Sequence, residues 1–230
     1  MTKREQILVI GATRGFGQAL ALRLAADGHC VLAAGRSPAA LAGASVLEVD
    51  VTDADSIARL FGEAMARGPV DAMVYCPSST GAVGPAWDCA DEEVRDVLDV
   101  GITGFTRCVR HAIPPMLAAG HGRILVVGSA GASNPVALLA AYCAAKAALE
   151  QYARCIAAEL SGSGVTCNIV QISAETALAQ THRREKERVR GAPSQHPPLP
   201  DVTDNLDPAL FLLSPQARHV NGQTLLACQP

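Results

Sequence analysis

Short apolar runs alternate along the chain with longer amphipathic stretches, and this alternation is the strongest constraint on the fold. Apolar runs of this length are typical of buried strands, and the stretches between them have helical periodicity. The predicted strands are residues 7–10, 30–34, 46–49, 72–75, 123–127, 165–171 and 224–227. The predicted helices are residues 15–27, 53–66, 91–117 and 138–160, with Asp53 as N-cap of the second and Pro114 and Pro115 interrupting the third near its end.

Strands connected by helices predict a mostly parallel sheet. The runs are apolar throughout, as expected of a sheet that is covered on both faces. We therefore expect an α/β fold, with a doubly wound parallel sheet of about seven strands in a single domain over residues 1–230. Residues 174–207 break the rhythm with a charged run and four prolines, and are expected to form an irregular insertion or lid on the substrate side of that domain.

Charge and composition exclude several classes of function. The net charge is −3 and aromatic residues make up 3%, so no nucleic-acid partner is expected. The chain has 8 cysteines but no Cys-x-x-Cys pair, which argues against a metal site and for buried thiols in a reducing, cytoplasmic location. The polar N-terminus leads directly into a short strand, unlike a signal peptide, and no apolar run reaches ~18 residues, so no membrane segment is predicted.

A glycine-rich turn joins the first predicted strand to the first helix. Glycines allow the backbone to approach a phosphate closely, and the helix N-terminus offers unpaired N–H groups to an anion. A tight turn without any ligand is the alternative interpretation. The predicted cofactor-binding residues of this turn are Gly11, Thr13, Arg14, Gly15, Phe16 and Gly17.

The second predicted strand ends at Gly35, Arg36 and Ser37. A site for NAD(H) would normally place an acidic residue there to bind the ribose 2′-hydroxyl, whereas an arginine suits the 2′-phosphate of NADP(H). Arg14 would add a second cation. The alternative is that both are ordinary surface arginines, but their positions favour NADP(H).

Tyr142 and Lys146 are four residues apart in a predicted helix and therefore share one face. A nearby ammonium group is expected to lower the pKa of the phenol, which would make Tyr142 a general acid and base. Ser129 follows the fifth predicted strand, where its hydroxyl would orient a carbonyl oxygen. The alternative is a pair on the surface of the helix without a catalytic role.

Taken together, these motifs resemble those of the classical short-chain dehydrogenases/reductases over nearly the whole chain. Gly11, Gly15 and Gly17 match the cofactor turn of that family, and Asp50-Val51 match its adenine-contacting segment. Ser129, Tyr142 and Lys146 match its catalytic residues. Tyr142 and Lys146 are also expected to contact the coenzyme, with the Lys146 ammonium at a ribose hydroxyl. The resemblance implies a Rossmann-type fold and hydride transfer between NADP(H) and a small carbonyl or alcohol substrate. It also implies a homodimer or homotetramer.

The chain departs from the family pattern at several positions. Tyr75-Cys76-Pro77-Ser78 replaces the family's Asn-Asn-Ala-Gly, Gly101 stands in place of its fourth catalytic residue, an Asn, and Ile172-Ser173 replaces Pro-Gly. Two accounts fit: an active reductase in which water or Thr103 replaces the proton relay, or a nucleotide-binding scaffold or sensor that reduces nothing. A reaction that uses the tyrosine without net redox change is a third.

The substrate side is predicted less sharply. The basic run of residues 183–190 would attract an anionic substrate or an acidic carrier protein, but the interleaved Glu185 and Glu187 favour a solvated, self-paired helix. Val136, Leu138 and Leu178 are compatible with a hydrophobic ketone.

Overall fold

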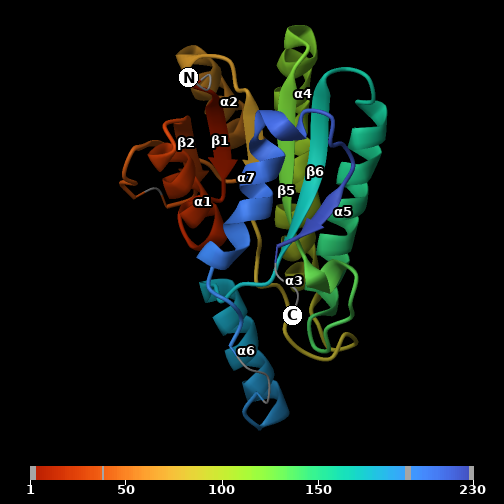
Figure 1. Ribbon diagram of the computed structural model, residues 1–230. Coiled ribbons are helices and arrows are strands. Elements are labelled where there is room, and N and C mark those ends of the chain that lie inside the picture. Colours follow the sequence, from red (N-terminus) through yellow and green to blue (C-terminus); the bar gives the residue numbers. More distant parts are fainter. Residues whose placement is uncertain (1–3, 38, 195–197, 228–230) are drawn as a thin grey trace.

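Seven strands form one parallel sheet in the computed structural model, which describes residues 4–37, 39–194 and 198–227 (Figure 1). The strands are β1 (Gln6–Ile10), β2 (Cys30–Gly35), β3 (Ala44–Glu48), β4 (Ala72–Tyr75), β5 (Gly122–Ser129), β6 (Val165–Ile172) and β7 (Thr224–Leu226). Their order is β3-β2-β1-β4-β5-β6-β7. The chain turns one way from β1 and the other way from β4, and ligands bind at such a switch point in doubly wound sheets.

Helices cover both faces of the sheet (Figure 1). The helices α1 (Gly15–Ala26) and α7 (Leu206–Leu213) pack on one face. The helices α2 (Ala54–Arg67), α4 (Gly104–Ala119) and α5 (Ala140–Glu159) pack on the other. Two more, α3 (Asp91–Leu98) and α6 (Ala177–Arg190), lie toward the carboxyl edge of the sheet. The predicted α/β class and doubly wound parallel sheet are confirmed.

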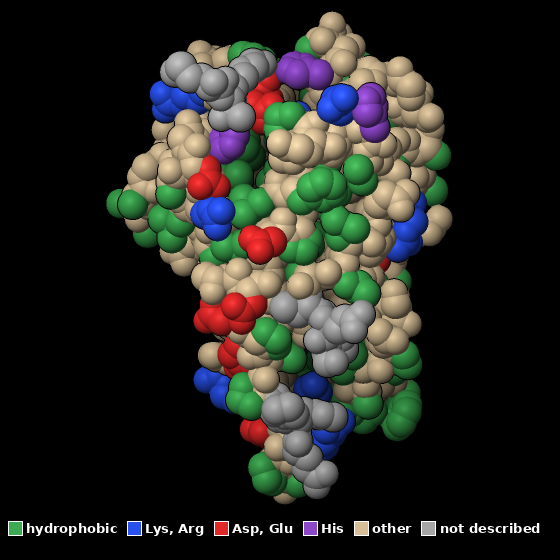
Figure 2. All heavy atoms as spheres, viewed as in Figure 1, with side chains coloured by type: hydrophobic (Ala, Val, Ile, Leu, Met, Phe, Trp, Pro, Cys, Tyr) green, Lys and Arg blue, Asp and Glu red, His purple; other side chains and the backbone are tan. Residues whose placement is uncertain are grey.

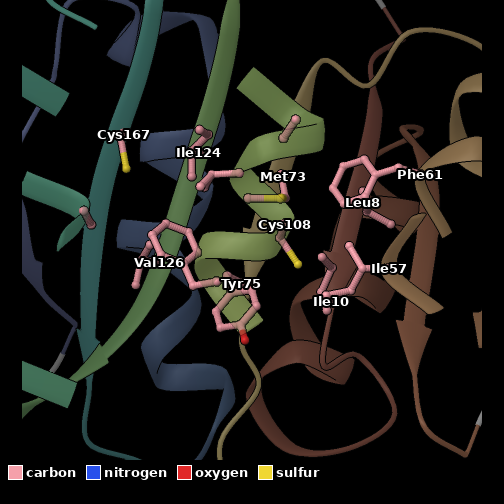
Figure 3. Close-up of a cluster of buried hydrophobic side chains, with 14 of the residues drawn as sticks. Leu8, Ile10, Ile57, Phe61, Met73, Tyr75, Cys108, Ile124, Val126 and Cys167 are labelled. Carbon is pink, nitrogen blue, oxygen red and sulfur yellow. The ribbon is translucent and has the colours of Figure 1, made fainter. Parts of the chain in front are cut away.

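The central strands are buried on both faces, and successive residues of a strand contribute to opposite layers. In β1, Leu8 and Ile10 join the core layer under α2, α4 and α5, whereas Ile7 and Val9 join the layer under α1 and α7. Figure 3 shows part of the first layer, with Met73 and Tyr75 of β4 among its side chains. A sheet filled in this way is rigid, so the loops at its carboxyl edge start from fixed positions.

The predicted elements occur where the sequence placed them, with ends shifted by a few residues. Asp53 caps α2 as predicted, since its side chain accepts a hydrogen bond from the N–H of Asp55. The predicted interruption of the third helix at the two prolines was wrong. Pro114 and Pro115 lie inside α4, which continues to Ala119. Both prolines are exposed, so the carbonyls that lose their partners one turn earlier are open to water.

The interruption of that helix lies earlier instead. Residues Asp99–Thr103 form a π-helical turn, η1, between α3 and α4. Such turns insert one extra residue into a helix and often occur at functional sites. Here the turn contains Gly101, one of the positions at which the chain departs from the family pattern.

Residues 174–207, expected to be irregular, include the 14-residue helix α6, which carries the charged run. In Figure 1, α6 projects beyond the carboxyl edge of the sheet. Figure 2 shows basic and acidic side chains mixed on this projection, and ion pairs such as Arg188–Glu185 at 2.8 Å connect them. The run is therefore helical and partly self-paired, since Arg183 pairs instead with Glu175 before the helix, and Pro197 lies outside the described residues. That the segment acts as a lid stays a prediction.

The expectation of buried thiols holds for only part of the cysteines. Cys108 and Cys167 are buried, but Cys155 is exposed, Cys228 lies outside the described residues, and four are half-buried, namely Cys30, Cys76, Cys89 and Cys143. None of the helices in the described part of the chain combines the length and apolarity needed to cross a bilayer.

Candidate active site

One large cavity of about 880 Å³ lies at the carboxyl edge of the sheet. Its walls come from the β1–α1 turn, the ends of β2, β5 and β6, and the helices α5 and α6. Every residue predicted for the cofactor or for catalysis borders it. These residues are Gly11, Thr13, Arg14, Gly15, Phe16, Gly17, Arg36, Asp50, Val51, Ser129, Tyr142 and Lys146.

The glycine turn forms one end of this cavity and has the shape of an anion cradle. Gly11 has a φ of +84°, and a Cβ on Gly17 would lie 2.4 Å from the carbonyl oxygen of Gly11, so neither position accepts a side chain without a shift. Arg14 is the N-cap of α1, and its side chain makes no capping hydrogen bond. The first N–H groups of α1 are therefore available to a phosphate.

The neighbouring wall carries Arg36, which is exposed at the end of β2, and Asp50, which follows β3. The Asp50 carboxylate accepts hydrogen bonds from the N–H and hydroxyl of Thr52, at 2.9 and 2.7 Å. These bonds lower the pKa of Asp50, and the positive charge of Arg36 adds to the effect. An ionised Asp50 beside the charged Arg36 suits the hydroxyl and phosphate groups of a ribose.

The opposite end of the cavity holds Ser129, Tyr142 and Lys146. Ser129 ends β5, and the two other side chains come from successive turns of α5. A hydrogen bond joins the side chains of Tyr142 and Ser129. The Ser129 hydroxyl also accepts the N–H of Gly131 at 3.2 Å. Lys146 is buried and its ammonium donates to the carbonyl of Val127 at 3.0 Å. The sequence therefore predicted correctly that these three residues lie together.

The expectation that the lysine lowers the pKa of the phenol was wrong for this structure. Burial raises the pKa of Tyr142, and the hydrogen bond with Ser129 offsets only part of that rise. Burial also lowers the pKa of Lys146 from 10.5 to about 8. The sequence could not show that Tyr142 is half-buried in the wall of the cavity. A raised pKa keeps the proton on the resting phenol but makes Tyr142 a weaker acid than an ordinary phenol.

Comparison with known proteins identifies the family. A model of the short chain dehydrogenases matches residues 5–187. The chain belongs to the short-chain dehydrogenase/reductase family. The 3-oxoacyl-(acyl-carrier-protein) reductase MabA of Mycobacterium tuberculosis is 32% identical over 225 residues, which are 95% of this chain and 89% of that protein. Human 17-beta-hydroxysteroid dehydrogenase type 1 is 30% identical over 209 residues, which are 84% of this chain and 61% of that protein.

Solved structures agree with this assignment. A variant of the actinorhodin polyketide ketoreductase, solved with NADPH, matches with a TM-score of 0.87 at 25% identity, over 99% of this chain and 97% of that one. A short-chain dehydrogenase/reductase from Mycobacterium ulcerans matches with a TM-score of 0.84 at 28% identity, over 96% and 87%. The resemblance inferred from the motifs is thereby confirmed at the level of the family and the fold.

The departures from the pattern of short-chain dehydrogenases are connected in space. The hydroxyl of Tyr75 donates to the carbonyl of Val100 in the π-helical turn at 2.6 Å. A Cβ on Gly104 would lie 2.5 Å from that hydroxyl, so the tyrosine fits only because Gly104 has no side chain. Gly101 itself is buried against Ala145 of α5, at 3.2 Å from where its Cβ would lie. Tyr75 thus stabilises a turn that lacks the family's asparagine.

The other departures line the cavity. Cys76, Pro77, Ser78, Ile172 and Ser173 all border it. By contrast, Thr103, which we considered as a substitute for the proton relay, is not among the described residues that line the cavity, although Val100 is. Leu138, predicted to contact the substrate, is likewise not among the described residues that line the cavity, and its neighbour Leu139 lines it instead. Leu138 has a φ of +70°, and its carbonyl accepts the N–H of Gly84 at 3.0 Å.

Two residues of the site were missed in the sequence. His182 of α6 is buried, its ring lies edge-on against Tyr142 with centroids 4.9 Å apart, and its Nε2 is 2.9 Å from the carbonyl of Thr80. Nothing in the local pattern of a charged run marks one histidine as the inward one. Glu150 is buried behind Lys146. Its spacing of four residues from Lys146 was visible, but burial was not.

Proposed function

We propose that this short-chain dehydrogenase is an NADP(H)-dependent oxidoreductase that reduces a carbonyl, or oxidises an alcohol, of a small organic molecule, with Tyr142 as the general acid and base. One observation carries the proposal. A single cavity has an anion cradle and exposed arginines at one end, and Ser129, Tyr142 and Lys146 at the other. A dinucleotide needs the first end, and proton transfer to a carbonyl oxygen needs the second.

The residues present fit the coenzyme. The free N–H groups of α1 would hold the pyrophosphate, Asp50 and Val51 would border the adenosine, and Arg14 and Arg36 would hold the 2′-phosphate. Relatives include an NADPH-dependent pterin aldehyde reductase from Arabidopsis thaliana and an NAD(+)-dependent 2-dehydro-3-deoxy-L-rhamnonate dehydrogenase from a Sphingomonas strain. The preference for NADP(H) therefore rests on the two arginines. When bound, the coenzyme supplies or accepts the hydride.

The protein's own residues would manage the proton. The Ser129 hydroxyl orients the substrate oxygen, and the phenol of Tyr142 donates its proton to that oxygen as negative charge develops. Burial raises the pKa of the phenol, so Tyr142 carries the proton that it would donate. The Lys146 ammonium lies one turn further along α5 and borders the same cavity, where it would hydrogen-bond a ribose hydroxyl of the bound coenzyme. Acid–base help of this kind typically contributes ~10²–10⁴-fold.

The substrate end of the cavity combines apolar and cationic side chains. Val136, Leu139 and Leu178 provide apolar surface, and Arg183 and Lys186 of α6 also border the cavity. Arg183 is paired with Glu175 at 2.7 Å, so its charge is largely balanced. We therefore propose an apolar ketone or aldehyde as the substrate, which fits the 3-oxoacyl and polyketide ketone reductases among the relatives by analogy only.

A homodimer or homotetramer in the cytoplasm is part of this proposal. The helices α4 and α5 are rich in small residues, which permit close helix packing between subunits, and α5 exposes 40% of Tyr152. Measurement of the mass in solution by light scattering tests it: a monomer at micromolar concentration would contradict the expected assembly.

Replacement of Tyr142 by Phe tests the proposed function directly. We expect Tyr142→Phe to bind NADPH with unchanged affinity and to lose turnover by at least about a hundredfold, because only the transferable proton is removed. NADPH consumption is followed against a panel of ketones, aldehydes and quinones. Equal rates in the wild type and the variant would favour the alternative of a scaffold or sensor that binds the nucleotide without redox chemistry.

A further inference from the structure

Four polar side chains occur at intervals of four residues on α5: Tyr142, Lys146, Glu150 and Arg154. Residues at this spacing lie above one another on one helix face. The first two border the cavity and have roles in the proposed function. Glu150 lies one turn further and is 1% exposed, which is unusual for a carboxylate and requires compensating partners.

The Glu150 carboxylate accepts hydrogen bonds from residues of β5, β6 and α5. Its Oε1 accepts the backbone N–H of Ser129 at 3.2 Å, and both of its oxygens accept the side-chain amide of Gln171 in β6, at 3.0 and 2.8 Å. Arg154 donates to Oε2 at 3.1 Å, and the same guanidinium nitrogen lies 3.4 Å from the hydroxyl of Thr224 in β7. The carboxylate therefore connects α5 directly with the ends of β5 and β6, and Arg154 extends the contact to the start of β7.

The end of β5 is shaped around this carboxylate. A Cβ on Gly128 would lie 2.3 Å from Oε1 of Glu150, so the residue before Ser129 must be a glycine as long as the carboxylate is in place. The carboxylate occupies the space of the missing side chain and takes the next N–H group of the strand. Ser129 thus owes its backbone position to a side chain that does not itself border the cavity.

We propose that Glu150 is a positioning residue of this site: its buried carboxylate fixes the backbone of Ser129, and with it the hydroxyl that meets Tyr142, and it holds a negative charge behind the Tyr142–Lys146 pair. The proposal rests on the proposed function for its catalytic consequence. Its structural and electrostatic parts concern the chain alone and are measurable without turnover.

The negative charge of Glu150 shifts the pKa values of Tyr142 and Lys146 in the same direction. A buried carboxylate opposes loss of the phenol proton and favours the charged lysine, so Glu150 raises the pKa of both Tyr142 and Lys146. Other groups around the pair remain in place when only Glu150 is changed. The titratable and charged groups facing the pair from the surrounding elements are Cys143 and Arg154 of α5, Cys76 after β4, and His182 and Lys186 of α6.

The test compares Glu150→Gln with Glu159→Gln, which removes an exposed carboxylate from the same helix. Glutamine keeps the length of the side chain and one acceptor oxygen but removes the charge. The first readout is the ultraviolet titration of tyrosinate, with Tyr142→Phe in each background to subtract the other tyrosines. We expect the Tyr142 titration to move to lower pH in Glu150→Gln and to stay unchanged in Glu159→Gln.

The second readout is the kinetics of carbonyl reduction. In Glu150→Gln we expect kcat to fall roughly tenfold to a hundredfold with little change in KM for NADPH. The new side-chain NH2 group would face the donors of Gln171 and Arg154, which displaces the acceptor of the Ser129 N–H, whereas the coenzyme end stays intact. The basic limb of the kcat/KM profile should also move to lower pH, since Lys146 loses the carboxylate that favours its charge. If the wild type consumes no NADPH, the proposed function fails, and the tyrosinate titration still decides the role of Glu150.

A second variant keeps the test decisive if Glu150→Gln does not fold. Arg154→Met removes the half-exposed cation from Glu150 and leaves the carboxylate in place, so it should move the Tyr142 titration to higher pH, opposite to Glu150→Gln. Opposite shifts of the two variants would support the proposal. Wild-type titration in both variants, or equal shifts in Glu150→Gln and Glu159→Gln, would overturn it.

Discussion

The glycine turn makes a sharp prediction through Gly17. In Gly17→Ala, the new methyl group would lie 2.4 Å from the carbonyl oxygen of Gly11, below the 3.0 Å that real Cβ contacts respect, so the turn must move by at least 0.6 Å. Overpacking of this kind costs about 1–3 kcal/mol. Replacement of a helical glycine by alanine returns up to about 1 kcal/mol. The net loss of stability is therefore small, roughly 0–2 kcal/mol.

The effect on coenzyme binding should be larger than the effect on stability. A displaced turn misdirects the first N–H groups of α1, and the loss of one hydrogen bond to a charged phosphate is worth about 1.5–3 kcal/mol. We therefore expect the Kd for NADPH, measured by fluorescence titration, to rise roughly tenfold to a hundredfold.

The control for this prediction is Gly62→Ala. Gly62 lies exposed in α2, and a Cβ there would have nothing within 4 Å. It should leave the Kd unchanged and add about 0.5–1 kcal/mol of stability. The reasoning would be refuted if Gly17→Ala bound NADPH as tightly as the wild type while it remained folded.

Three further predictions concern the coenzyme, the pH profile and the π-helical turn. NADP(H) should bind more tightly than NAD(H), and Arg36→Asp should reduce or reverse that preference; tighter NAD(H) binding by the unmutated protein, seen in paired titrations, would contradict this. Burial lowers the pKa of Lys146 to about 8, so its ammonium is lost above that pH. The value of kcat/KM for carbonyl reduction should therefore fall as pH rises through about 8. A pH profile in which kcat/KM falls only near pH 10.5 would contradict this. Tyr75→Phe leaves the Val100 carbonyl without its donor and should cost about 1–3 kcal/mol in denaturant unfolding, whereas the half-exposed Tyr152→Phe should cost little; equal costs would speak against this role of Tyr75.

The features that the sequence predicted well are those encoded locally. The strand β1, the glycine turn and α1 follow from an apolar run, three glycines and helical periodicity within about twenty residues. The shared helix face of Tyr142 and Lys146 follows from a spacing of four. Parallel order then brings the ends of β1 and β5 to one edge, which places Ser129 near the turn.

The features that were missed depend on contacts between distant segments. The π-helical turn is held by the hydroxyl of Tyr75, a partner 25 residues away from Val100. The raised pKa of Tyr142 comes from burial, to which no local pattern points. His182 faces Tyr142 only because α6 borders the cavity and meets Thr80, a contact across 102 positions. Spacing along one helix cannot reveal such partners.

The proposed function requires that the large cavity bind a phosphorylated nicotinamide coenzyme beside the Tyr142 phenol. Calorimetric titration of the folded protein with NADP⁺ and NADPH measures this binding. We expect saturable heat with both forms, at one site per chain, and a weaker response to NAD(H). Absence of any heat of binding with either form, from protein shown to be folded by circular dichroism, would contradict the account.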